Sequence, residues 1–483
     1  MNILVLDVGT SGMRGVLYDN GGKARFIHRV RYSVRTSGGL VEQPAGDWGR
    51  ALIEICQQAA EQGDRIDALS LTSQRSSVIP LDRWGTPLRD AIMWQDTRNA
   101  PIVKELSPQA GRITALTGAR LNTVFSGTKM TWFRRNEPDL YAKTFKLCTI
   151  ADYITFLITG NFVTDETYGS RSLLMGLKSR KWEPELLELF EVEEEKLCRL
   201  TEPGSISGTV TAEFSQKTGI PAGIPLISAG GDQQCGALGQ GLLEEGAMTV
   251  TLGTSACILK CAGSIPEELN GVICGAHAIP RRFVLEGSML TCGATFDWVR
   301  RTFFSEGDFT AVNQAVSASP PGANGVIVLP YFQGRGTPDW NSGARGGFLN
   351  LSLSATRADM ARAALEAVVY EIVNEIEIME AMGPTGDTIR AGGGATNSLA
   401  FCGMLADASG KTVLSGDNTE GTAFGAWMNA AVTLGVCADY AEAFGIAGEE
   451  TARSTTRPRP ENYRIYSIGR ERMNEMYLKL GLV

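Results

Sequence analysis

One aspartate of this sequence is a candidate for acid–base chemistry. Asp232 lies in Ala229–Gln234, which reads AGGDQQ, between an apolar run and a stretch of small residues. The two glycines leave room for a ligand against the backbone, and a carboxylate there can accept a hydroxyl proton as a general base. Aspartate is also a favoured helix N-cap. The flanking Gly-Gly and Gln-Gln pairs favour the catalytic role over this structural one.

A second acid ends the first apolar run. Ile3–Ser11 reads ILVLDVGTS, so Asp7 stands just before a glycine turn. A carboxylate at a strand end beside such a turn suits Mg²⁺, held through water because this ion dehydrates reluctantly. Arg14 follows closely enough to reach a phosphate oxygen. An ordinary hairpin with a turn aspartate is the alternative reading of the same residues.

The Gly-Thr-Ser turn occurs twice. Ala247–Ser255 reads AMTVTLGTS, and both copies end a β-rich run and precede another short apolar run. A repeated strand–turn–strand unit at half the chain length predicts two related domains. A turn-rich stretch precedes Leu226–Asp232, so we place the boundary near Gly241, with domains at 1–241 and 242–483. The two turns can present backbone N–H groups to one ligand from opposite sides.

Further glycine and polar segments complete the candidate site. Gly392–Gly394 exposes backbone that can lie flat against adenine or a phosphate, with Asn397 one helical turn later. A plain strand-to-helix loop would use glycine in the same way. Ser73–Ser76 and Trp94–Asp96 place polar groups beside aromatic or apolar residues, as a polyol site requires, although each segment taken alone also suits a structural role.

The elements that must position these residues are mixed α and β. Residues 66–71 and 326–329 read as strands. Residues 356–382 carry apolar side chains at intervals of three and four, which predicts a long helix that starts at Thr356 and Asp359. The acidic residues at 191 and 193–195 are expected on a solvated helix face.

Composition excludes several classes of function. The 483 residues include 56 glycines but only 2 histidines, so a His-rich zinc site or a two-histidine relay lacks its ligands. With 45 basic and 53 acidic residues the formal net charge is −8, which disfavours nucleic-acid binding. The sequence lacks a complete P-loop, GxGxxG or G-x-S-x-G motif.

The expected location is cytoplasmic. The 10 cysteines have no CxxC spacing and read as free thiols of a reducing compartment. The first residues lack the basic region of a signal peptide, and no apolar run is as long as a membrane span. We therefore expect no membrane partner.

Taken together, the chain resembles the FGGY carbohydrate kinases over nearly its whole length. The matching segments occur in family order: LDVGTSGMRGVLYD, SQRSS, AIMWQDTR, FSGTKMTWFRR, SAGGDQQ, VTLGTSACIL, LEGSMLTCGATFDW and AGGGATN. The resemblance implies an α/β fold with two actin-like (RNase H-like) domains and an ATP and sugar cleft between them, in agreement with the repeated turn. It also implies ATP and Mg²⁺ as cofactors.

The resemblance also implies roles for individual residues. Asp232 matches the catalytic base, which would deprotonate a terminal sugar hydroxyl as this attacks the γ-phosphate. The positions that match substrate contacts are Arg75, Ser76, Trp94 and Gln233. The positions that match nucleotide contacts are Thr10, Ser11, Arg14, Thr254, Gly293, Asp297, Gly393 and Asn397, although glycerol kinases of the family carry Gln where Asp297 stands.

Departures from the family pattern bear on the substrate. Glycerol kinases carry Glu, Tyr and Phe where this chain has Ser76, Val124 and Cys257. Losing hydroxyl-binding side chains would penalise glycerol, and the smaller residues leave room for a longer substrate. Xylulose kinases usually show QMHG at Ser73–Ser76, so that match is also imperfect. We expect a ketopentose such as xylulose, with glycerol or another polyol next.

Two rival functions stay open at this stage. The same fold also serves nucleotide-gated binding proteins, which need the Gly-Thr-Ser turns but not Arg75, Trp94 or Gln233 beside Asp232. A kinase of this family acting on a linear signalling molecule or a sugar acid is the second rival. A small sugar or polyol is the expected partner, and a homodimer is the expected assembly.

Overall fold

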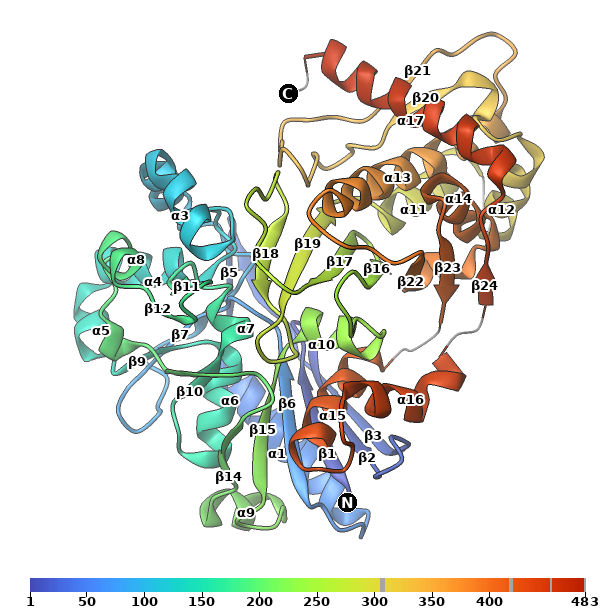
Figure 1. Cartoon of the computed structure of the whole chain (residues 1–483). Coiled ribbons are helices and arrows are strands. Elements are labelled where there is room, and N and C mark those ends of the chain that lie inside the picture. The colour runs from blue at the N-terminus through green and yellow to red at the C-terminus, as the bar shows by residue number, and fades with distance from the viewer. Residues whose placement is uncertain (305–308, 417–419, 452–453, 482–483) are drawn as a thin grey trace.

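The computed structural model describes residues 1–304, 309–416, 420–451 and 454–481. Figure 1 shows the N-terminal half, from blue to green, in the lower and left part of the view, and most of the C-terminal half above and to the right. Each half is built on one large mixed sheet flanked by helices. The expected α/β fold with two related domains is therefore confirmed.

The first sheet has the strand order β14-β15-β6-β1-β2-β3. Its central strand β1 runs antiparallel to β2 and parallel to β6, and β6 runs parallel to β15. The strands are β1 (Ile3–Val8), β2 (Gly12–Tyr18), β3 (Ala24–Arg31), β6 (Ala68–Ser73), β14 (Ile206–Thr209) and β15 (Pro225–Gly231).

The second sheet repeats this pattern. Its order is β18-β19-β17-β16-β22-β23-β24, with β16 antiparallel to β17 and parallel to β22. The strands are β16 (Met248–Leu252), β17 (Ala256–Ala262), β18 (Ile273–Ala276), β19 (Phe283–Met289), β22 (Thr388–Gly392), β23 (Thr412–Ser415) and β24 (Ser454–Thr456). The two Gly-Thr-Ser turns join β1 to β2 and β16 to β17, as the sequence predicts.

Strand β1 explains how the first sheet presents its acid. All six of its residues are buried, which is typical of a central strand covered on both faces. Leu4, Leu6 and Val8 face one core cluster, with helix α1 (Ala45–Glu61), and Ile3 and Val5 face the other, with α15 (Gly421–Thr433). Because side chains alternate along a strand, Asp7 falls on the α15 side.

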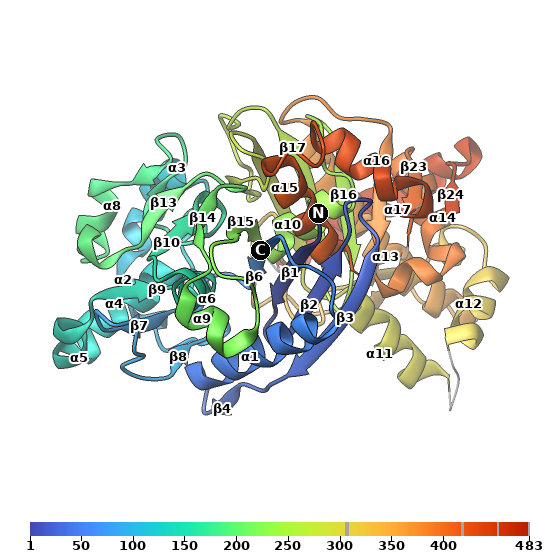
Figure 2. The ribbon, with the colours of Figure 1, turned by 90° about the horizontal axis from the view of Figure 1, so that it is seen from below.

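Helices α10 (Asp232–Gly239) and α15 connect the two halves. Helix α10 follows β15, and α15 lies beyond β23 in the chain but packs against α10, β1, β6 and β15 of the first half, as Figures 1 and 2 show. A β-carbon on Gly239 would lie 2.0 Å from the carbonyl oxygen of Gly421, and one on Gly425 would lie 1.9 Å from that of Cys235. The two helix backbones are therefore in direct contact.

The long helix α13 (Arg357–Glu380) forms the core of the second half. Thr356 and Asp359 make the reciprocal hydrogen bonds of a capping box at its start, as predicted. The predicted strands at 66–71 and 326–329 are β6 and β20. The acidic residues at 191 and 193–195, however, form a turn and a short 3-10 helix rather than a helix face, and Glu191 and Glu193 pair with Arg135 and Arg134.

The remaining elements form smaller sheets and peripheral helices. The strands are β4 (Arg35–Ser37), β5 (Leu40–Gln43), β7 (Ile79–Leu81), β8 (Ala91–Ile92), β9 (Lys146–Cys148), β10 (Val163–Asp165), β11 (Met175–Gly176), β12 (Lys181–Trp182), β13 (Arg199–Thr201), β20 (Ile327–Leu329) and β21 (Gly347–Leu349). The helices are α2 (Ala100–Leu106), α3 (Ala110–Thr117), α4 (Ser126–Asn136), α5 (Pro138–Lys143), α6 (Ile150–Thr159), α7 (Glu166–Gly169), α8 (Pro184–Leu189), α9 (Ala212–Thr218), α11 (Gly293–Phe303), α12 (Phe309–Ala318), α14 (Leu399–Ser409), α16 (Tyr440–Thr451) and α17 (Pro460–Lys479).

The ten cysteines are free thiols, and all but Cys257 are buried. Among the described residues, none of the helices combines the length and the apolar character that crossing a bilayer requires. The chain passes from the first sheet to the second between α10 and β16. The division at Gly241 stays a prediction, because α15 belongs to the second half by sequence and to the first by packing.

Candidate active site

The carboxyl ends of β1, β6 and β15 meet at one edge of the first sheet. Asp7 is paired in register with Thr72, and Thr72 with Gly230. The segments that follow these strands, including Arg75 and Asp232, therefore lie side by side. In sheets of this kind, ligands bind beyond the carboxyl ends of the strands.

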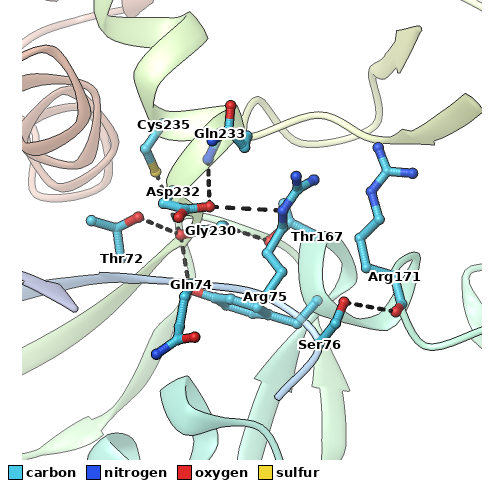
Figure 3. A network of polar contacts seen from close by, with 12 residues as sticks. Thr72, Gln74, Arg75, Ser76, Thr167, Arg171, Gly230, Asp232, Gln233 and Cys235 are labelled. Carbon is cyan, nitrogen blue, oxygen red and sulfur yellow. Dashed lines mark hydrogen bonds and ion pairs between the residues drawn. The ribbon is translucent and has the colours of Figure 1, made fainter. Parts of the chain in front are cut away.

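Helix α10 begins at the candidate base. Gly231 occupies the N-cap position without a side-chain cap, and Asp232 is the first helical residue. The backbone N–H of Gln233 donates to Asp232 Oδ1 at 2.8 Å, and Arg75 Nε lies 3.7 Å from the same oxygen, as Figure 3 shows. Asp232 is therefore not the N-cap of this helix. Its side chain keeps 28% of its surface exposed.

The surroundings of Asp232 favour its protonated form. Burial raises the pKa of this carboxyl to about 6, Arg75 opposes the rise, and the charges of Asp7 and Glu286 add to it. A carboxylate with a pKa near the working pH is suited to accept a proton and release it again. The electrostatics therefore agree with the expected role as a base.

Asp232, Arg75, Glu286 and Arg171 form a chain of ion pairs with alternating charge. Glu286 Oε2, on β19 of the second half, accepts from Arg75 Nη1 at 3.2 Å and from Arg171 Nη2 at 2.7 Å. Burial by itself raises the pKa of Glu286, but Arg171 and Arg75 outweigh it and lower the pKa to about 2. Glu286 is therefore ionised, and it ties the second half to two arginines of the first.

A cavity of about 480 Å³ opens in front of these groups. Both halves contribute to its wall, including Cys257 and Glu286 from the second sheet. The predicted site residues that line it are Thr10, Arg75, Ser76, Trp94, Asp232 and Gln233. The predicted substrate contacts are therefore brought together with the candidate base in one space.

A buried lysine supports one wall of this cavity. Asn122, Val124 and Phe125 line it, and Lys129 Nζ donates to the carbonyl oxygens of Thr123 at 2.6 Å and Val124 at 2.7 Å. Burial lowers the pKa of Lys129 to about 7. The lysine in the FSGTKMTW segment therefore holds the backbone of the 123–124 segment, next to the residues that line the cavity.

The first Gly-Thr-Ser turn faces the same space. Thr10 Oγ1 accepts from Trp94 Nε1 at 3.1 Å, so the turn and the tryptophan are held together. Ser11 is exposed beside it. Arg14 is paired with Asp7 and, at 2.9 Å, with Glu420 next to the start of α15. In this structure the predicted phosphate contact therefore lies in an ion-pair cluster rather than in the cavity wall.

Asp7 has one clear partner. Burial raises the pKa of its carboxyl, and Arg14 opposes the rise through charge and a hydrogen bond. A single carboxylate already shared with an arginine offers few ligands to a cation. Such a donor set fits Mg²⁺ that keeps most of its water and takes its other ligands from phosphate.

The second turn is enclosed by two glycines. A β-carbon on Gly293, at the start of α11, would lie 2.5 Å from the carbonyl oxygen of Gly253, and one on Gly393 would lie 2.5 Å from that of Leu252. The backbone N–H of Gly293 donates to Gly253 at 2.8 Å. The predicted nucleotide residues Thr254, Gly293 and Gly393 therefore form one backbone-lined surface.

Two further predicted nucleotide residues, Asp297 and Asn397, are exposed to solvent. Asp297, one turn into α11, is 41% exposed and pairs with Arg300 and Arg301. Asn397 is exposed at the end of the 3-10 helix that follows Gly393. Neither residue lines the cavity next to Asp232.

Arg171 and Glu286 were missed as site residues by reasoning from the sequence. Glu286 lies in the LEGSM part of a quoted motif, so its position was marked although its partner was not. Arg171 follows α7 and is 2% exposed. Its one signal is a charged residue between two serines, a pattern that surface loops also show.

Models of known protein families match both halves of the chain. The N-terminal domain of the FGGY family of carbohydrate kinases matches residues 2–239, and its C-terminal domain matches residues 248–434. The chain belongs to the FGGY family of carbohydrate kinases. The expected family is thereby confirmed, and with it the class of enzyme, a phosphotransferase that uses ATP as phosphate donor.

Relatives of this FGGY kinase carry two different names. It is 28% identical over 438 residues to xylulose kinase of Staphylococcus xylosus, covering 89% of this chain and 90% of that one. It is 32% identical over 452 residues to glycerol kinase of Solidesulfovibrio magneticus, covering 90% of each. The structure of xylulose kinase from Lactobacillus acidophilus matches with a TM-score of 0.93 at 24% identity over 99% of this chain and 98% of that one. This FGGY kinase is therefore a carbohydrate kinase whose relatives act on sugars or polyols.

Proposed function

We propose that this FGGY kinase transfers the γ-phosphoryl group of ATP to a terminal hydroxyl of a ketopentose such as xylulose, with Asp232 as the general base. The observation that carries the proposal is the place of Asp232. It lies at the start of α10, at the wall of a cavity of about 480 Å³ lined by both halves, with its pKa raised to about 6.

The chemistry follows from this arrangement. The acceptor hydroxyl gives its proton to a carboxylate oxygen of Asp232 while its own oxygen attacks phosphorus, and the bond from phosphorus to the bridging oxygen of ATP breaks. Arg75, 3.7 Å from Asp232, keeps the carboxylate oriented and favours its ionised form before the reaction. Trp94, held by its hydrogen bond to Thr10, would contact the acceptor beside the first turn. Closure of the two halves would exclude water from the transfer.

The nucleotide is proposed to lie on the second half. Thr254, Gly293 and Gly393 form the surface for its phosphates and adenosine, with Asn397 and Asp297 at the edge. Thr10, Ser11 and Arg14 would meet the γ-phosphate from the first half, and Arg14 must then leave part of its pairing with Asp7 and Glu420. Asp7 would hold Mg²⁺ through water, and the ion would neutralise charge on the phosphates.

The size of the cavity is compatible with a ketopentose as well as with glycerol. At no more than about 30 Å³ for each non-hydrogen atom, a triol with six such atoms needs less than about 180 Å³ and a ketopentose with ten less than about 300 Å³. The cavity of about 480 Å³ accommodates the larger acceptor and a phosphoryl group. Ser76, Val124 and Cys257, which are smaller than their counterparts in glycerol kinases, all line it.

Glycerol is the second candidate. It is favoured by the glycerol kinase of Solidesulfovibrio magneticus, which is 32% identical to this chain. A screen of the purified enzyme against pentuloses, hexuloses, polyols and sugar acids separates the two. A ratio of kcat/KM for xylulose over glycerol above one supports the ketopentose, and a ratio below one rejects it.

The role of Asp232 is tested by Asp232→Asn and Asp232→Ala. General-base catalysis contributes about 10²- to 10⁴-fold to the rate, so the phosphorylation rate of both variants should fall by at least about 100-fold. Their affinity for ATP, measured by calorimetry, should stay within a few-fold of that of the parent enzyme. Acceptor-dependent ADP release at near-normal rate in either variant would reject the base. A homodimer and a cytoplasmic location stay predictions, the first open to light scattering.

A further inference from the structure

The turn that carries Asp232 is held from one side by the start of α7. Thr167 Oγ1 accepts a hydrogen bond from the backbone N–H of Gly231 at 2.8 Å and donates one to Asp165 Oδ1. Asp165, at the end of β10, also accepts from the backbone N–H of Thr167 at 2.8 Å and from Ser228 Oγ. A chain of hydrogen bonds therefore runs from the residue before Asp232 to a buried carboxylate.

The carbonyl end of the same peptide group is fixed as well. The carbonyl oxygen of Gly230 accepts from Thr72 Oγ1 at 2.8 Å and from Tyr168 Oη at 2.9 Å. Figure 3 shows Thr72 and Thr167 reaching the Gly230–Asp232 turn from two sides. The peptide group between Gly230 and Gly231 is thus held at both its C=O and its N–H by side chains of β6 and α7.

Asp165 is the acceptor at the end of this network. The residue is fully buried, and within the described part of the chain it has no ion-pair partner. A buried carboxylate without a cation is costly unless several donors satisfy it. Because the Thr167 hydroxyl donates a hydrogen bond to the Asp165 carboxyl group, the hydroxyl oxygen becomes a stronger acceptor for the Gly231 N–H.

Asp232 depends on this support because its own side chain is weakly held. Among described contacts its carboxylate has the N–H of the next residue and Arg75 at 3.7 Å. Gly230 has φ +109°, and a β-carbon on it would lie 3.1 Å from Thr167 Cγ2. Two successive glycines allow the backbone many conformations. Contacts from outside the turn must therefore fix the position of Asp232.

We infer that Thr167, oriented by Asp165, is the positioning residue of the catalytic base: it fixes the Gly231 peptide and thereby the carboxylate of Asp232 relative to the acceptor hydroxyl. This inference rests on the proposed function, since it takes Asp232 to be the base. A displacement of about 1 Å in a reacting group costs up to about 100-fold in rate. Loss of the Thr167 hydroxyl should therefore appear in kcat.

The test compares Thr167→Val with Thr167→Ser. Valine keeps the shape and removes the hydroxyl, whereas serine keeps it. We expect Thr167→Val to lower kcat by about 10- to 100-fold, with KM for ATP within about twofold because the proposed nucleotide surface lies in the other half. Thr167→Ser should stay within about threefold of the parent enzyme in both constants.

Thr218→Val is the matched control. Thr218, at the end of α9 ahead of β15, is also a buried threonine that accepts a backbone N–H, from Ile220 at 3.3 Å, and donates to a carbonyl oxygen. It lies at the opposite end of β15 from Asp232. Both valine variants should lose stability to a similar degree in thermal unfolding, but Thr218→Val should keep its kcat at 20 °C.

The outcomes separate this inference from the proposed function. If Asp232→Asn is inactive while Thr167→Val turns over within twofold of the parent enzyme, the positioning role is overturned and the base stands. If Thr167→Val and Thr218→Val lose kcat equally, the effect is structural and the inference is also overturned. Activity in Asp232→Asn rejects the base and, with it, the inference.

Discussion

The two halves of the molecule repeat one fold but carry different side chains at equivalent positions. In the first half, the strand before the Gly-Thr-Ser turn carries Asp7, and the helix that follows β15 begins with Asp232. In the second half, Thr251 takes the place of Asp7. There the turn is enclosed by Gly293 and Gly393 instead of charged side chains.

This difference shows how one topology can serve two partners. Titratable groups and ion pairs gather beside the first turn and at the start of α10, where Asp232 is proposed to accept the proton. The second Gly-Thr-Ser turn instead presents exposed backbone without bulky side chains, and there a phosphate or a flat base is proposed to approach closely. The duplicated fold thus determines where a ligand binds, and the side chains on each half determine the chemistry at that place.

The largest effect is expected from Gly393→Ala in the second half. Gly393 has φ +100°, and its β-carbon would lie 2.5 Å from the carbonyl oxygen of Leu252. With ψ 173°, this backbone conformation is one that essentially only glycine adopts and costs an alanine about 1–3 kcal/mol, and overpacking adds about 1–3 kcal/mol. We expect ATP affinity, measured by calorimetry, to fall by about 100-fold or more, with acceptor binding kept.

The adjacent glycine provides the control. A β-carbon on Gly394 would meet no atom within 4 Å, so Gly394→Ala should bind ATP like the parent enzyme. In the first half, a β-carbon on Gly9 would lie 3.2 Å from the carbonyl oxygen of Gly12, which predicts an intermediate loss for Gly9→Ala. Equal losses in all three variants would contradict the contrast between the turns.

An intermediate effect is expected from pH. Asp232 must be ionised to accept a proton, and its pKa is raised to about 6, so kcat/KM for the acceptor should fall about tenfold per unit as the pH drops below 6. Phosphate groups also titrate near pH 6, so the informative quantity is a difference between two enzymes.

Glu286→Gln supplies that difference. The charge of Glu286 raises the pKa of Asp232, so its removal should move the acidic limb to lower pH. Glu213→Gln, on the exposed face of α9 with 79% of its side chain accessible, should leave the limb where it is. A limb that does not move in Glu286→Gln would show that another group controls it.

The smallest effect on turnover, and the one that contrasts the buried acids of the two halves, is expected from Glu375→Met. Neither carboxylate oxygen of Glu375, on α13, has a hydrogen-bond partner among the described residues, whereas Asp165 in the first half is satisfied by donors. An unsatisfied buried group costs on the order of 1–3 kcal/mol. We expect Glu375→Met to raise the free energy of unfolding by that order with kcat unchanged, and Asp165→Asn to lower it.

The pH dependence of stability gives the sign of the Glu375 effect. Burial raises the pKa of Glu375 well above its usual value, so the folded state keeps a proton that the unfolded state loses above about pH 4.3. Stability is therefore lost as the pH rises from there towards the folded-state pKa. The advantage of Glu375→Met in chemical denaturation should grow from pH 5 to pH 8, and a constant advantage would mean that ionisation plays no part.

Much of the fold follows from local sequence. The apolar run of β1, the repeated Gly-Thr-Ser turn and the Thr356–Asp359 start of α13 each carry a signal within a few residues, and the structure has all three. The return of α15 to the first sheet is different. Its glycines match those of α10 across the fold, and no local pattern shows that two small-residue helices will meet.

The site was predictable where function leaves a motif and not where it depends on partners. Asp232 and the turns were marked by glycine patterns. Arg171 was not, because its importance comes from Glu286, which is 115 residues away in sequence. Arg14 shows the same limit in reverse: a turn motif predicts a phosphate contact but not the pairing of this residue with Glu420.

The contact between α10 and α15 leaves no room for a side chain between the two helices. No side chain separates Gly239 from Gly421 or Gly425 from Cys235, so the backbones of the two helices are in direct contact at both places. A methyl group at either glycine would force them apart. Since Asp232 begins α10, a substitution that pushed α15 away from this helix would also disturb the turn that carries the proposed base.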